Sequence, residues 1–156
     1  MNQMKIKHHK YRARPGWYSA DLQPCAKDDG VYYFKSALEV QFARRLELEK
    51  RAGDIIDWSY EPVKITLRRK DGERYCDYRP DFKIYVDKYK IRPGDDYTDL
   101  AYFLECKGML RPGDRRKLAL AASQLSDPLY VFTARWGKLP AEEYLNRMKK
   151  KGIKLK

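Results

Sequence analysis

The chain has 156 residues, of which 43% are hydrophobic and 36% charged, and its formal net charge at pH 7 is +12. This size and composition fit one domain with a modest core, and no apolar run approaches the roughly 18 residues of a membrane-spanning helix. Three widely spaced cysteines argue against a disulfide framework and a structural zinc site, and they favour a reducing, cytoplasmic setting.

The positive charge indicates a polyanionic partner, most often nucleic acid. Basic ends of a chain can hold DNA phosphates without reading sequence, although they can also serve only as solubilising tails. The basic residues of the two ends are Lys5, Lys7, Lys10, Arg12 and Arg14, and Arg147, Lys149, Lys150, Lys151, Lys154 and Lys156.

Residues 1–35 are rich in turn-forming residues, and we expect a basic, largely irregular N-terminal arm. From Ser36 onward, apolar residues recur at helical spacing. The stretch "SALE" has the form of a capping box, and Gly53 is a suitable end for this helix.

Two strands are expected next, at residues 58–67 and 74–86, joined as a hairpin through the turn residues 70–72. A third strand at 100–106 is apolar enough to lie inside a sheet. A helix beginning near Pro112, a strand at 128–133 and a helix at 140–151 complete the chain. The order αβββαβα predicts an α/β fold with a small mixed sheet flanked by helices, a core at 36–140, and a C-terminal helix and basic tail at 141–156.

Two strand ends carry the residues of chemical interest. In the strand that reads "FLECKG", Glu105 and Lys107 are two positions apart and therefore project to the same face, whereas Cys106 turns to the other. In "YRPDF", Pro80 lacks a backbone donor and favours a strand start or an edge, which would let Asp81 approach the same place.

This set of residues suits phosphodiester hydrolysis. Asp81 and Glu105, with a backbone carbonyl at Cys106, form a suitable oxygen-rich site for Mg²⁺, for which Mn²⁺ can substitute. Lys107 beside them can orient or deprotonate an attacking water and neutralise charge on the phosphate.

The motifs "RPDF" and "LECKG" resemble the PD-(D/E)xK nuclease superfamily, with Asp81, Glu105 and Lys107 at its motif positions. The expected element order is also similar to that superfamily's restriction-endonuclease-like core. The stretches "FKSALE" and "KGMLRPGDRRK" are most similar to the phage endonuclease I group of Holliday-junction resolvases. The likeness covers roughly residues 34–133.

This resemblance implies a metal-dependent DNA endonuclease that cuts branched DNA as a homodimer, with Glu39 as a further acid of the metal site. That group has another acid on its first strand, whose place falls on Ser59, with Glu61 the nearest carboxylate. The "YEP" at residues 60–62 instead looks like the transposon-end-cleaving nucleases.

Each assignment has a simpler alternative. Glu39 can serve only in the capping box with Ser36, and Glu61 is expected to be a surface or hairpin charge. A basic triplet at the start of the second main helix can clamp phosphates or form a solvated face: Arg115, Arg116 and Lys117. The whole chain could instead be a non-catalytic DNA-binding module or a nuclease that needs partner subunits.

Overall fold

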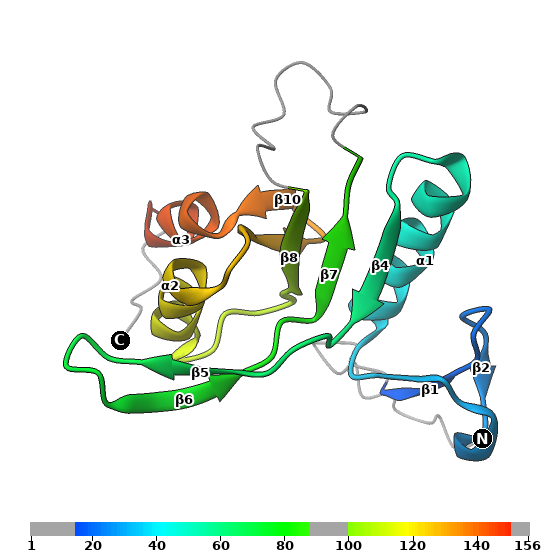
Figure 1. The fold of residues 1–156 in the computed structure, drawn as a ribbon, viewed down its shortest axis with the longest axis horizontal. Helices are drawn as coiled ribbons and strands as arrows, with labels where there is room; N and C mark the ends of the chain where they lie inside the picture. The colour runs from blue at the N-terminus through cyan, green and yellow to red at the C-terminus, as the bar shows by residue number, and fades with distance from the viewer. Residues whose placement is uncertain (1–14, 88–99, 151–156) are drawn as a thin grey trace, which may run out of the picture.

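The computed structural model describes residues 15–87 and 100–150 of the chain. It confirms the α/β class, because three helices and several β-sheets pack together (Figure 1). The basic residues 5–14 and 151–156 lie outside the described residues, so the expectations for those ends stay predictions.

The central sheet has five strands in the order β10-β9-β8-β7-β4. β8 runs parallel to β9, and the other neighbouring pairs are antiparallel, so the sheet is mixed as expected. Its strands are β4 (Asp57–Tyr60), β7 (Phe82–Tyr85), β8 (Ala101–Cys106), β9 (Leu129–Thr133) and β10 (Gly137–Pro140).

Helices cover both faces of this sheet. Leu104 and Phe82 pack in one hydrophobic cluster with α1 (Ala37–Ala52), whereas Phe103 and Val131 pack in a second cluster with α2 (Asp114–Gln124) and α3 (Ala141–Lys150). Neighbouring residues of β8 thus enter different cores, as the two-residue period of a strand requires.

The limits of α1 follow from local chemistry. The Ser36 hydroxyl oxygen accepts a hydrogen bond from the Glu39 N–H at 3.3 Å. At the other end, Gly53 has φ 77°, a left-handed conformation in which its N–H reaches the carbonyls of Glu49 and Lys50. The predicted first and last residues of this helix are therefore confirmed.

The expected hairpin strands are each divided in two. Glu61 has φ 46° and is followed by Pro62, while Pro80 interrupts the partner strand, so neither run continues as one strand. The Glu61 N–H donates to the Asp81 carbonyl at 2.7 Å and holds the two breaks side by side. Beyond them a separate two-stranded sheet forms from β5 (Ile65–Arg68) and β6 (Arg74–Tyr78).

The expectation of a largely irregular N-terminal arm is wrong for residues 16–34. They contain a three-stranded antiparallel sheet of β1 (Gly16–Tyr18), β2 (Pro24–Cys25) and β3 (Tyr32–Phe34). Aromatic contacts between strands hold it, including the Trp17–Tyr33 ring pair at 5.2 Å. The sequence did not predict these strands, because two or three residues are too few to show an alternating pattern.

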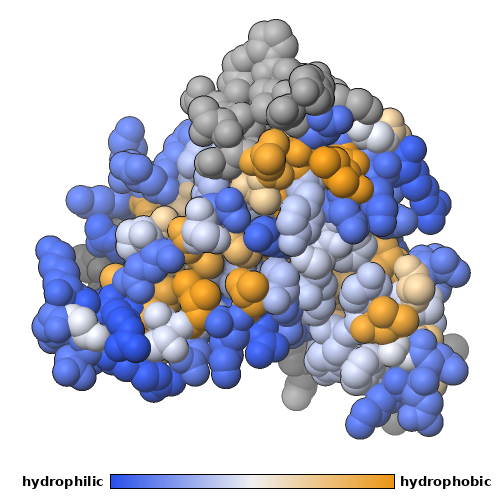
Figure 2. Space-filling view, in the orientation of Figure 1, coloured by the Kyte–Doolittle hydropathy of each residue, from blue (hydrophilic) through white to orange (hydrophobic). Residues whose placement is uncertain are grey.

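On the face shown in Figure 2, hydrophobic residues of the described chain form small patches separated by hydrophilic residues. No helix of the described segments combines the length and apolar character that crossing a bilayer requires.

Candidate active site

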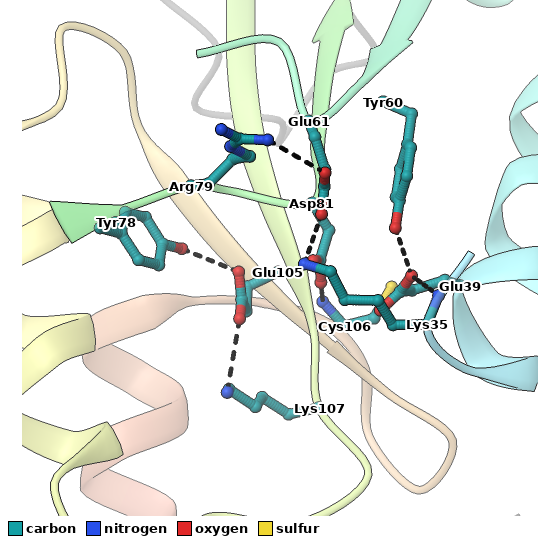
Figure 3. Close-up of polar contacts among 10 residues, drawn as sticks. All are labelled: Lys35, Glu39, Tyr60, Glu61, Tyr78, Arg79, Asp81, Glu105, Cys106 and Lys107. Atoms are coloured by element: carbon teal, nitrogen blue, oxygen red, sulfur yellow. Dashed lines mark hydrogen bonds and ion pairs between the residues drawn. The ribbon is translucent and has the colours of Figure 1, made fainter. Parts of the chain in front are cut away.

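The predicted residues come together where the hairpin β5–β6 leaves the central sheet (Figure 3). Asp81 directly precedes β7, and Glu105 is the second-last residue of β8, which pairs with β7. Both carboxylates are buried, with 5% of Asp81 and 9% of Glu105 exposed. Glu39, from the first turn of α1, is also buried at 5% exposure.

The end of β8 has the predicted alternation. The Lys107 ammonium lies 3.4 Å from a Glu105 carboxylate oxygen, so the two side chains share a face. A second carboxylate, Asp114 at the start of α2, lies 3.4 Å from the same ammonium. Cys106 instead packs against the cluster on the α1 side, so its candidate donor to a metal is the backbone carbonyl.

Asp81 is fixed by the neighbouring strand. Its Oδ2 accepts a hydrogen bond from the Cys106 N–H at 2.8 Å, which joins the start of β7 to the end of β8. Figure 3 shows the Asp81 carboxylate between Glu105 and Glu39, which come from β8 and α1. Acids from three segments distant in the sequence therefore lie in a row, with Asp81 in the middle.

Two tyrosines that the sequence did not single out hold the acids in position. The Tyr78 hydroxyl donates to Glu105 at 2.9 Å, and the Tyr60 hydroxyl donates to Glu39 at 2.8 Å. Both tyrosines lie at the strand breaks, one at the end of β6 and the other at the end of β4. No motif spacing marks them, because their role depends on where the breaks bring the chain.

For Glu39, the capping function and a place in the site coexist. Its backbone N–H bonds to Ser36, while its carboxylate accepts from the Lys35 N–H at 2.9 Å and from Tyr60. The carboxylate thus bonds the backbone one residue before the N-cap, rather than the Ser36 N–H of a full capping box, and also contacts Tyr60 of the site.

Glu61 is more enclosed than a plain surface charge, since 18% of its side chain is exposed. It forms ion pairs with Lys35 and, at 3.5 Å, with Arg79. In Figure 3, Arg79 lies on the side of Asp81 opposite Lys107, whereas the Lys35 ammonium is drawn beside the Asp81 carboxylate. Positive charges thus lie near each of these acids: Lys107 at Glu105, Lys35 near Asp81 and Arg79 at Glu61.

Burial is the largest cause of the pKa shifts in the site. It raises the pKa of Asp81 well above its usual range, and the nearby charges of Glu105 and Glu39 raise it further. Burial also raises the pKa of Glu105, although Lys107 partly opposes the shift. For Lys107, burial lowers the pKa, but Glu105 and Asp114 outweigh it and the net shift is upward. A group of buried acids that resists ionisation favours a cation at its centre.

The three expected DNA-contacting residues have different surroundings. The Arg116 guanidinium lies 4.7 Å from the centre of the Tyr75 ring, and the Lys117 ammonium lies 5.6 Å from that of the Tyr78 ring. Because Tyr78 bonds Glu105, Lys117 lies next to the site, and its charge lowers the pKa of Glu105. Arg115 is exposed. The triplet therefore connects the site to the outer surface of α2.

The donor set fits a hard cation that keeps much of its water. Within residues 15–87 and 100–150, no three His, Cys, Asp or Glu side chains are grouped closely enough to hold a metal by themselves. Mg²⁺ is usually bound through one or two carboxylates and retains several waters. Asp81, Glu105 and the Cys106 carbonyl are enough donors for that smaller requirement. A bound cation would also offset the free-energy cost of ionising the two buried acids.

Comparison of the chain with protein-family models, with curated proteins and with solved structures gave no match.

Proposed function

We propose that the protein is a divalent-metal-dependent DNA endonuclease with a restriction-endonuclease-like core. The observation that carries this proposal is the meeting of two buried acids, Asp81 and Glu105, beside Lys107 at the junction of β7 and β8. A structural ion pair would need one acid for one lysine. Here Asp81 adds a second buried acid next to the Glu105–Lys107 pair, and its carboxylate accepts from the Cys106 N–H.

In this proposal Asp81, Glu105 and the Cys106 carbonyl hold Mg²⁺, or Mn²⁺ in its place. The ion would make a bound water more acidic and offset negative charge on the phosphate. Lys107, held between Glu105 and Asp114, orients the attacking water and stabilises the charge that develops on the phosphate.

The surrounding residues support this arrangement. Tyr78 holds one oxygen of Glu105 while Lys107 faces the other. Glu39 supports the site from α1 and is itself fixed by Tyr60. Arg115 and Arg116 at the start of α2 are exposed and can contact phosphates that flank the cleaved bond.

The favoured substrate is branched DNA cut by a homodimer, which rests on the resemblance to phage junction resolvases. A four-way junction needs paired cuts, and two sites at a fixed separation would supply them. The net charge of +12 gives affinity for any duplex, so preference has to be measured at salt concentrations where non-specific binding is weak.

The test is cleavage of four-way-junction, nicked, linear duplex and single-stranded DNA at near-physiological salt, with Mg²⁺, Mn²⁺, Ca²⁺ or EDTA. Light scattering reports the oligomeric state. We expect cuts in the junction with Mg²⁺ or Mn²⁺ and binding with little turnover in Ca²⁺, whose longer bonds position water poorly.

Each other outcome of this test favours a different function. Full activity in EDTA would reject the metal assignment. Equal cleavage of linear and branched DNA by a monomer would reject the resolvase reading. Binding without cleavage under every condition would favour a non-catalytic module, or a nuclease that works only with partner subunits of the transposon-end type.

A further inference from the structure

A cavity of about 340 Å³ lies directly beside the proposed active site. Its walls come from the loop after β8, the turn after β9, Leu38 at the start of α1, and Tyr144 and Met148 of α3. Lys107 belongs to this wall and also contacts Glu105, so the cavity begins where the acid group ends. A molecule in the cavity would therefore neighbour whatever Lys107 contacts.

The cavity wall is largely apolar and aromatic. Trp136 and Tyr144 meet edge to face with ring centres 6.0 Å apart, and Leu110 and Met148 add flexible apolar surface. Met109, 40% exposed, stands among the lining residues. Flat apolar walls of this kind suit a planar ring, and unpaired nucleobases bind proteins by stacking on such side chains.

The turn that carries Trp136 is fixed before any ligand binds. The Trp136 N–H donates to the Thr133 hydroxyl oxygen at 3.0 Å. The guanidinium groups of Arg147 and Arg135 lie 5.7 Å and 6.0 Å from the indole ring. The cavity thus combines an ordered aromatic wall with cations around it.

These features select one class of occupant. An apolar side chain of a partner protein would match the walls but would offer no counter-charge to Arg135, the exposed cation of the lining; Lys107 already pairs with Glu105 and Asp114. A nucleotide matches both, because its base is planar and its phosphate is negative. Lys107 already faces the place assigned to the scissile phosphate, so base and phosphate can belong to the same or adjacent nucleotides.

We propose that this cavity receives one unpaired nucleobase from the DNA, next to the bond that is cleaved. This inference rests on the proposed nuclease function and narrows its substrate class to DNA with an unpaired or easily unstacked nucleotide beside the cut. Unstacking a base costs a few kcal/mol in paired duplex and least where the base is already unpaired. The cavity therefore favours branch points, bulges and mismatches over continuous duplex.

The first test measures affinity in EDTA, where no cleavage is expected. Two duplexes are compared, one with a single bulged nucleotide and one with an abasic residue at the bulge. We expect the base-containing bulge to bind about fivefold tighter or more. Equal affinities would overturn the inference.

Two variants test whether the affinity difference between the two bulges arises in this cavity. Ala134 is exposed and lines the cavity, so Ala134→Phe should fill the space and abolish the difference between the two bulges. The matched control is Ala52→Phe, an exposed alanine at the far end of α1, which should keep the difference. If Ala134→Phe fails to fold, Met109→Ala should reduce the difference at least twofold. A difference that persists unchanged in the folded cavity variant would overturn the assignment.

A photo-crosslink shows independently where on the protein the bulged base binds. With 5-iododeoxyuridine as the bulged nucleotide, we expect crosslinked peptides that contain Trp136, Tyr144 or Met109. Crosslinks confined to the aromatic residues of the N-terminal sheet, such as Trp17 and Tyr33, would overturn the inference.

Cleavage separates this inference from the proposed function. With Mg²⁺, cuts should fall within one nucleotide of the bulge. Cuts elsewhere, with equal binding of base and abasic bulges, would overturn the cavity assignment and leave the nuclease proposal standing. Tight base-dependent binding without cleavage of any DNA would reject the proposal that the protein cleaves DNA by itself, and with it the narrower substrate class, while the cavity would remain a base-binding site.

Discussion

Asp81 combines a role in the proposed chemistry with a cost to the metal-free fold. Its pKa is raised well above the usual range by burial and then by Glu105 and Glu39. A carboxyl whose pKa is higher in the folded state binds its proton more tightly there. The stability it contributes is full below the unfolded pKa of about 3.9 and is lost as pH rises through the folded pKa. The ionised form of this buried side chain is therefore the form that destabilises the fold.

We expect Asp81→Asn to raise the melting temperature in EDTA and to abolish stabilisation by added Mg²⁺. The change removes a buried group whose ionisation is costly but keeps an oxygen that can accept the Cys106 N–H. The rise should be about 3 °C for each kcal/mol of repulsion removed. Cleavage should fall by several orders of magnitude while DNA affinity stays within about tenfold.

Thermal unfolding with and without Mg²⁺ checks the stability part of this prediction. The matched control is Asp54→Asn, an exposed aspartate beyond the end of α1, which should change neither value. A lower melting temperature for Asp81→Asn in EDTA would show that the acid stabilises the fold, and wild-type cleavage would show that the site is misplaced.

A pair of variants separates the two roles found at the start of α1. Ser36→Ala removes the oxygen that caps the Glu39 N–H, and it should cost about 1 kcal/mol of stability with cleavage retained. Glu39→Gln keeps an acceptor for Lys35 and Tyr60 but removes the charge, so it should weaken cleavage with little loss of stability. Urea unfolding and a cleavage rate measure both. Equal effects of the two variants on cleavage would show that Glu39 acts only through the helix.

At the scale of elements, the hairpin β5–β6 is coupled to the site. Tyr78 is the last residue of β6 and donates to Glu105, while Leu67 of β5 is fully buried against α2 and its neighbours. The hairpin is therefore a packed extension of the core. Movement of this hairpin would also move the hydroxyl that positions Glu105.

Gln124 at the end of α2 fastens this hairpin. Its amide accepts from the Arg68 N–H at 2.9 Å and donates to the Arg68 carbonyl at 2.7 Å. We expect Gln124→Ala to lower the free energy of unfolding by about 1–2 kcal/mol and to speed hydrogen exchange across the hairpin. The neighbouring exposed change Ser123→Ala is the control. Unchanged exchange in the hairpin with Gln124→Ala would contradict the anchor.

At the scale of the whole molecule, positive charge should govern DNA affinity. Arg115 and Arg116 are exposed at the start of α2, near the site. Neutralising both as Arg115→Gln with Arg116→Gln should reduce the slope of log affinity against log salt by about 2. The control changes Lys50 and Arg51 to Gln at the far end of α1, where both pair with acids. An equal loss of slope in both double variants would show that charge alone matters, wherever it lies.

The features that could be predicted from the sequence are those set by interactions between residues close together in the chain. A hydroxyl at Ser36 and a glycine at position 53 set the ends of α1, because caps depend on residues within a turn of each other. The two-residue period of a strand placed Glu105 and Lys107 on one face and Cys106 on the other. The α/β class followed from the same patterns.

The remaining features of the fold and the site depend on contacts between segments that are distant in the sequence. Asp81 meets Glu105 because β7 pairs with β8, and Tyr60 and Tyr78 reach the acids because two strands break at the same level. The short strands β1 to β3, β10 and the division of the hairpin also lay beyond sequence patterns. A local pattern determines which face a residue takes within its own element. Which other faces it meets depends on how distant segments pack, and that is settled only by the free energy of the whole fold.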